Sequence, residues 1–129
     1  MLKAAIKELP GFRVLLDKVV NVPHPKGSKQ VRFAYFLTIV NDSAEVVNVK
    51  GRKWVIREKS GYTTVVEGDG VVGEFPCIGP GQRFSYNSSH LVTVDAMVEG
   101  ALLAVTLSGG KVIAKIPPFL LTVPREPLP

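Results

Sequence analysis

The stretch VRFAYFLTIVN, residues 31–41, decides the fold of this 129-residue chain. Side chains alternate between two faces along a β-strand, so every second residue points the same way. We expect one face of this stretch to lie in the core, because it carries Val31, Phe33, Tyr35, Leu37 and Ile39. The pattern therefore predicts a β-strand with one apolar face turned inward.

The neighbouring segments are also of strand type. Residues 12–22 predict a strand that ends at the two prolines and the glycine of residues 23–27. Residues 46–49 and 52–57 predict one strand with a break or bulge at Gly51, in which Trp54 and Ile56 share a face. Residues 60–61 predict a hairpin turn into a strand at 62–67, which is rich in β-branched side chains.

The second half of the chain continues this pattern without helical spacing. Strands are expected at residues 74–78, 83–86, 91–97, 100–108, 112–116 and 119–123, with a two-residue hairpin loop at 109–110. The proline-rich end, residues 124–129, is expected to be an extended tail. The sequence thus predicts an all-β, immunoglobulin- or fibronectin type III-like antiparallel β-sandwich of about eight strands, with residues 1–123 as one domain.

Composition narrows the class of protein. Hydrophobic residues make up 46% and charged residues 21%, as in ordinary globular proteins. Cys77 is the only cysteine, and no apolar stretch is long enough to span a membrane, so we expect a cytoplasmic protein. The net charge of +5 allows an anionic partner, but the scattered lysines and arginines favour a solvated surface over nucleic-acid binding.

The sharpest local motif is GDGVVG, residues 68–73, which has the G-x-G-x-x-G spacing of dinucleotide-binding turns. In those folds the third glycine lies in a helix whose N-terminus binds the pyrophosphate. Pro76 and Pro80 follow here, so we expect extended chain after Gly73 and no dinucleotide site of that kind. A loop of backbone N–H groups that accepts a phosphate stays open, with a nearby arginine supplying positive charge.

Three carboxylates, Glu67, Asp69 and Glu74, flank the glycines. They would repel a phosphate unless a basic side chain or a cation intervened, or they would themselves hold Mg²⁺. The third interpretation is conformational, in which the glycines adopt positive φ in turns and the carboxylates are solvated. The conformational interpretation is favoured, because that is the commonest role of glycine.

Familiar catalytic signatures are missing from the sequence. His24 and His90 stand in no nucleophile-elbow or H-E-x-x-H pattern, and Cys77 lacks the close partner of a zinc site. We expect Cys77 to be a small core residue, because free cysteine is usually buried. Five aromatic residues could stack on nucleic-acid bases, but core packing is favoured for them. They are Phe33, Tyr35, Trp54, Tyr62 and Tyr86.

Three segments resemble the ApaG family in order and spacing: FAYFLTIVN at 33–41, RKWVI at 52–56 and GDGVVGEFP at 68–76. The likeness continues through IGPG at 78–81, FSYNS at 84–88 and Met97, and it ends near residues 116–120. One departure is DAMVEG at 95–100, where the family shows Gly-x-Met-x-Gly. A second is the basic loop at residues 26–30.

The resemblance implies an immunoglobulin- or fibronectin type III-like sandwich, found as a small bacterial protein and as a domain of some F-box and polymerase-interacting proteins. It implies a binding module with a link to cobalt and magnesium phenotypes. It also implies a pyrophosphate or nucleotide ligand at Gly68, Gly70 and Gly73.

The leading prediction is a non-enzymatic binding module that engages a protein partner, or a pyrophosphate or nucleotide, through the glycine-rich loop or an exposed strand edge. One alternative is a metal-dependent nucleotide or pyrophosphate phosphohydrolase, and another is nonspecific nucleic-acid binding by a basic surface. A homo-oligomer formed through a strand edge is also compatible with the sequence. The predicted ligand-binding residues are Gly68, Gly70, Gly73, Arg52 and Arg57, and the predicted Mg²⁺ ligands are Glu67, Asp69 and Glu74.

Overall fold

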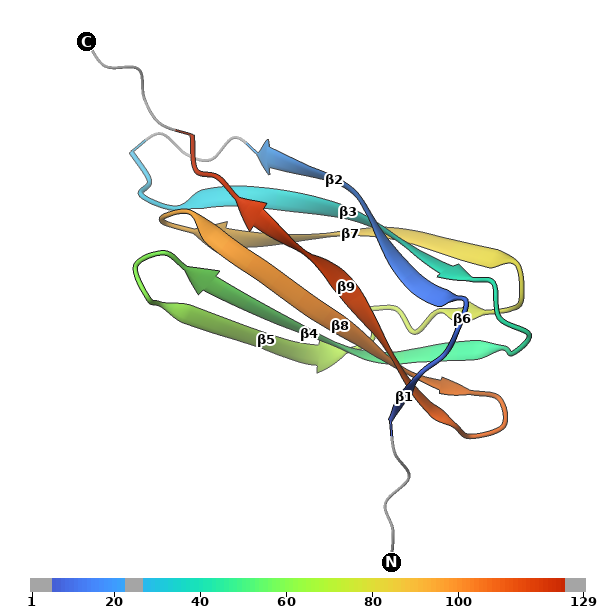
Figure 1. Ribbon diagram of the computed structural model, residues 1–129. Helices are drawn as coiled ribbons and strands as arrows, with labels where there is room; N and C mark the ends of the chain where they lie inside the picture. The colour runs from blue at the N-terminus through green and yellow to red at the C-terminus, as the bar shows by residue number, and fades with distance from the viewer. Residues whose placement is uncertain (1–5, 23–26, 125–129) are drawn as a thin grey trace, which may run out of the picture.

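The computed structural model describes residues 6–22 and 27–124, which form two β-sheets packed face to face (Figure 1). Residues 23–26 of the turn predicted at 23–27, with His24, and residues 125–129 of the predicted tail lie outside the described residues. One sheet has the order β2-β3-β7, and the other has the order β1-β9-β8-β4-β5, with β6 also paired to β4. This confirms the all-β sandwich, while the finer immunoglobulin or fibronectin type III assignment stays a prediction.

The strands follow the chain in the order of their labels, and all neighbours pair antiparallel except β1 and β9, which are parallel. The described part of the chain contains no helix, and so none that could cross a membrane. The bounds are β1 (Lys7–Glu8), β2 (Phe12–Val22), β3 (Val31–Asn41), β4 (Val47–Glu58), β5 (Thr63–Asp69), β6 (Cys77–Ile78), β7 (Gln82–Val92), β8 (Ala96–Thr106) and β9 (Lys111–Leu121).

The strand predicted at residues 31–41 is β3, with the predicted bounds. The side chains of Phe33, Tyr35, Leu37 and Ile39 are buried, as the alternation predicts. Thr38, on the opposite face, is buried as well. Its hydroxyl donates to the Asp17 carboxylate on β2 at 2.6 Å and lies 3.0 Å from the Ser85 hydroxyl on β7. Because β3 lies between β2 and β7, side chains from both neighbours cover its outer face.

The core lies between the sheets and is centred on aromatic side chains. The ring centroids of Tyr35 and Trp54 are 5.4 Å apart, and those of Tyr35 and Phe119 are 4.9 Å apart in an edge-on contact. Aliphatic side chains from both sheets surround these rings, and burying each one contributes about 1.5–3 kcal/mol relative to leaving it exposed. Among them are Leu37, Ile56, Val98, Leu102 and Ile116.

Two strand predictions in the second half of the chain are wrong. The single strand expected at residues 91–97 is interrupted, because β7 ends at Val92 and β8 begins at Ala96. The Glu58 carboxylate accepts hydrogen bonds from the backbone N–H and the hydroxyl of Thr93, at 2.7 and 2.8 Å, and so holds the intervening turn. The strand expected at 74–78 contains only the two residues of β6.

The predictions for the last hairpin also need correction. The loop between β8 and β9 has four residues instead of two, closed by hydrogen bonds between the backbones of Thr106 and residues 109 and 110. Pro117 and Pro118 do not end a strand, since β9 continues to Leu121. Proline is tolerated there because this half of β9 is a sheet edge and the register with β8 shifts between Val98 and Gly100.

Leu102 and Leu103 on β8 test the assignment of inner and outer faces. Leu102 is fully buried, whereas Leu103 is 40% exposed. We expect Leu102→Ala to lower the free energy of unfolding by about 2–5 kcal/mol, because it leaves a cavity. Leu103→Ala should cost less than about 1 kcal/mol. Urea unfolding followed by circular dichroism measures both, and equal costs would contradict the assignment.

Candidate functional site

The glycine-rich loop follows β5 and contains a tight turn instead of a helix. Val71 and Glu74 exchange two backbone hydrogen bonds, of 2.8 and 2.9 Å, across Val72 and Gly73. Both central residues have positive φ, 48° for Val72 and 78° for Gly73, which is the pattern of a type I′ turn. No helix begins at Gly73, as predicted, and the chain after it forms a strand only at Cys77 and Ile78.

Gly70 holds the base of this turn against β4. Its N–H donates to the Lys50 carbonyl at 2.8 Å, and its φ is 61°. A Cβ atom at this position would lie 2.2 Å from the Glu74 carbonyl oxygen, so only glycine fits. The ring of Phe75 also lies close to Gly70. This glycine therefore has a conformational role, as the favoured interpretation of the motif predicts.

The backbone donors of the loop are largely used within the protein. The N–H groups of Gly70, Val71 and Glu74 donate to carbonyl groups of Lys50, Glu74 and Val71, respectively. A phosphate bound by backbone alone requires several free N–H groups pointing to one place. These three N–H groups are therefore not available to an anion.

Of the two predicted arginines, the structure brings only Arg52 to the loop. Arg52 shares the inner face of β4 with Trp54, and its Nη1 donates to the carbonyls of Asp69 at 2.9 Å and Gly70 at 3.3 Å. The guanidinium lies so close to Gly68 that a Cβ there would be 2.7 Å from Nη1. Arg57 lies five residues after Arg52 on β4, so its side chain faces the opposite way, outward, where it pairs with Glu99.

The three predicted metal ligands are not gathered. Glu67 and Asp69 lie on the exposed face of β5, and Oε1 of Glu67 is 3.5 Å from Nζ of Lys53. Glu74 lies beyond the turn and is exposed. Within residues 6–22 and 27–124, no three His, Cys, Asp or Glu side chains lie close enough to share a metal ion. The predicted Mg²⁺ site has no gathered set of ligands among these residues.

Sequence reasoning did not single out the apolar tip of this loop. Val71 is buried, but Val72 and Phe75 are 58% and 57% exposed. The signal available in the sequence was a pair of large apolar residues beside glycines in an otherwise acidic segment. A β-branched residue with positive φ is an outlier, which sequence alone does not reveal.

Cys77 is exposed, so the prediction that it is a core residue is wrong. It lies on β6, where Asn48 and Val47 of β4 pair with Cys77 and Ile78. Adjacent residues of a strand face opposite ways, and Ile78 takes the inner position, with 2% exposed. The two-residue strand therefore turns the thiol outward.

Of the five aromatic residues considered for base stacking, Phe33, Tyr35 and Trp54 are buried, which confirms core packing for them. Tyr62 is exposed, and Tyr86 is partly buried against the core. His90 lies beside this core, with its ring centroid 5.4 Å from that of Trp54 and its Nδ1 3.1 Å from the Tyr35 hydroxyl. Burial, assisted by the charge of Arg52, lowers the pKa of His90 to about 4.

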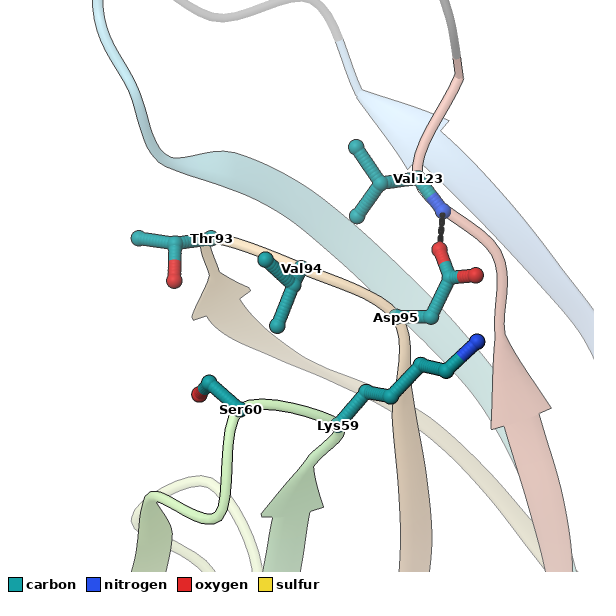
Figure 2. Close-up of a pocket in the computed structure, with 6 residues that line it drawn as sticks. All are labelled: Lys59, Ser60, Thr93, Val94, Asp95 and Val123. Atoms are coloured by element: carbon teal, nitrogen blue, oxygen red, sulfur yellow. Dashed lines mark hydrogen bonds between the residues drawn. The ribbon is translucent and has the colours of Figure 1, made fainter.

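A separate hollow lies at one end of the sandwich (Figure 2) and has a volume of about 430 Å³. The backbone N–H of Val123 donates to the Asp95 carboxylate at 2.7 Å, and the Lys59 N–H donates to the Asp95 carbonyl. Asp95 therefore joins two loops, which is a structural role. The hollow offers no nucleophile paired with a base, and it is lined by Lys59, Ser60, Thr93, Val94, Asp95 and Val123.

Arg52→Met should loosen the glycine-rich loop, because the carbonyls of Asp69 and Gly70 lose their charged donor. We expect the free energy of unfolding to fall by about 1.5 kcal/mol and amide exchange at Gly70 and Val71 to accelerate. The matched control is Arg57→Met, which removes an exposed ion pair and should cost no more than about 1 kcal/mol. Unchanged exchange in Arg52→Met would contradict this role of Arg52.

His90 should make stability depend on pH. In the folded protein His90 binds a proton only near pH 4, whereas in the unfolded chain it binds one near its ordinary pKa of 6.5. The free energy of unfolding should therefore fall as pH falls through this window, by about 3 kcal/mol at most. Urea unfolding between pH 7 and pH 4 should show a weaker dependence for His90→Gln, which removes the imidazole and keeps every carboxylate. Identical pH dependence in the two proteins would refute the prediction.

Comparisons with known proteins agree with this geometry. The ApaG domain family matches residues 23–105. Protein ApaG of Rhodopseudomonas palustris (strain TIE-1) is 39% identical over 99 residues, which cover 76% of each chain. Protein ApaG of Vibrio cholerae serotype O1 (strain ATCC 39541 / Classical Ogawa 395 / O395) is 41% identical over 94 residues, covering 72% of this chain and 75% of the relative. The X-ray structure of Northeast Structural Genomics Consortium target SoR45 superimposes with a TM-score of 0.80 at 31% identity, covering 88% of each chain. This chain belongs to the ApaG domain family.

Proposed function

We propose that this ApaG-family chain is a non-enzymatic binding module that engages a protein partner through the loop tip, Val72 and Phe75. The observation that carries the proposal is the backbone of Val72, whose φ is 48° although its side chain is 58% exposed. A β-branched residue in this conformation costs about 1–3 kcal/mol, and such strain is typical of functional positions. Because the Val72 side chain is exposed, its contacts within the monomer offset little of this conformational free energy.

The tip has the character of a small protein-binding surface. Two large apolar side chains, Val72 and Phe75, are exposed beside the carboxylates of Asp69 and Glu74. An apolar centre with a polar rim is the usual anatomy of an interface. The type I′ turn and the two hydrogen bonds from Arg52 fix the loop, so little conformational entropy would be lost on binding.

A phosphate-bearing ligand at the same loop is supported less well. The N–H groups of Gly70, Val71 and Glu74 are bonded within the protein, and Nη1 of Arg52 already donates to two carbonyls. The carboxylates of Asp69 and Glu74 also lie on this loop and would repel a phosphate. A metal-dependent phosphohydrolase lacks a gathered set of ligands in the described part of the chain. A basic nucleic-acid surface is weakened by ion pairs that involve Arg13, Lys53, Arg57 and Lys115. A cytoplasmic role in divalent-cation homeostasis would then act through the bound partner.

Val72→Asn separates strain from binding. Asparagine is favoured in the first central position of a type I′ turn, so the free energy of unfolding should rise by about 1 kcal/mol, as chemical denaturation would measure. Binding should weaken in the same variant, because the apolar side chain is lost. A gain in stability together with a loss of binding is the expected signature.

Binding is measured by photo-crosslinking in cells that express the chain with a benzophenone amino acid at position 72. A crosslinked product should form there and not from position 107, where an exposed leucine lies on a different loop. Excess wild-type protein added to cell extract should compete for the product, and Phe75→Ala should compete less. Equal competition by Val72→Asn and wild type would overturn the proposal. Release of phosphate from pyrophosphate or a nucleotide, abolished by Asp69→Asn, would overturn the non-enzymatic assignment.

A further inference from the structure

The two sheets have edges that differ in how they are protected against further pairing. On one side of the sandwich, β2 carries a bulge between Leu16 and Lys18, and β9 carries Pro117 and Pro118 and is partly covered by β1. Bulges, prolines and covering segments are devices that prevent added strands. On the other side, β5 is short, at seven residues, and ends with the carboxylates of Glu67 and Asp69.

The free edge of β7 has none of these devices. The strand is 11 residues long, and its register with β3 runs without a shift from Gln82 to Val92. It contains no proline and no lysine, and Arg83 is its only permanently charged residue. No other described strand pairs with its outer side. A long, regular and nearly uncharged edge is a template for another strand.

One buried polar atom on β7 is also unpaired. The Tyr86 hydroxyl is the one buried side-chain polar atom without a hydrogen-bond partner among the residues described. Buried hydroxyl groups are nearly always bonded, so a lone one calls for an explanation. Tyr86 packs against the core from the inner face of β7, so the case for added pairing depends on the backbone of the free edge.

The sequence of β7 favours a copy of itself as that strand. If the whole strand pairs antiparallel about a two-fold axis, Asn87 lies opposite Asn87 of the second copy and Ser85 lies opposite Ser89. Arg83 then lies opposite Leu91, so no like charges face each other. Because of the two-fold axis, the Ser85–Ser89 and Arg83–Leu91 pairs each occur twice, and the assembly closes at two chains.

We propose that this chain forms a homodimer in which two β7 strands pair antiparallel about Asn87 and join the two β2-β3-β7 sheets into one continuous sheet. This dimer is separate from the binding proposed for the tip at Val72 and Phe75. It leaves the outer face of the β1-β9-β8-β4-β5 sheet uncovered.

Charge placement on β7 tests the pairing and its register. Ser85→Lys combined with Ser89→Lys puts like charges opposite each other twice per dimer and should raise the dissociation constant about tenfold or more. Ser85→Lys combined with Ser89→Glu puts opposite charges together and should leave it unchanged or lower it. In this second variant the introduced lysine lies near Asp17 and the introduced glutamate near Arg32, so the monomer accommodates both changes. The control adds two lysines at the exposed residues Val20 and Leu107 and should dimerise like wild type.

Sedimentation velocity from low to high micromolar concentration measures the dissociation constants. A wild-type protein that stays monomeric throughout would overturn the proposal, as would equal dissociation constants for the Ser85→Lys/Ser89→Lys variant and the control. Val72→Asn should leave dimerisation unchanged, so failure here is distinct from failure of the proposed function.

Oxidative crosslinking locates the two-fold axis. In a Cys77→Ser background, Asn87→Cys should form a covalent dimer under mild oxidation, because the two thiols face each other across the strand pair. Val20→Cys in the same background is the control and should remain monomeric. Equal crosslinking of both variants would overturn the proposed pairing.

Discussion

The contact between Tyr35 on β3 and Trp54 on β4 holds the two sheets together, and the rest of the structure depends on it. Both side chains are almost completely buried, with ring centroids 5.4 Å apart. Because side chains alternate along a strand, placing Trp54 inward also turns Arg52 and Ile56 inward and Arg57 outward. A slip of one residue in β4 would reverse all of these positions, so the aromatic contact fixes the face on which each side chain lies.

This alternation connects the core to the glycine-rich loop and to the sheet edge. Arg52 faces inward beside Trp54 and donates to two loop carbonyls, so the loop is anchored by a residue of the core face. His90 packs on Trp54 and lies 3.1 Å from the Tyr35 hydroxyl, which fixes the position of β7 as well. Burial also raises the pKa of Tyr86 on that strand to about 12, above the ordinary value for tyrosine.

Several features were correctly predicted because they depend on consecutive residues. The bounds of β2 and β3 follow from alternation and from the turn residues around them. The register shift between Val49 and Gly51 falls where glycine interrupts a strand pattern. The wrong predictions lie where a group far away in the sequence determines the local structure. The turn after Val92 is held by Glu58, from 35 residues earlier in the chain, and Cys77 is turned outward by its pairing with β4.

The sequence by itself determined the all-β class, the inner face of the central strand and the absence of a nucleotide-binding helix after Gly73. These follow from local backbone preferences and from period-two alternation, which are properties of neighbouring residues. Only the tertiary structure decided that Arg52 and not Arg57 reaches the loop, that Val72 is strained and exposed, and that β7 has a free edge. Each of these depends on which strands pair across long stretches of chain, and that choice is made by packing in the core and not by any one segment.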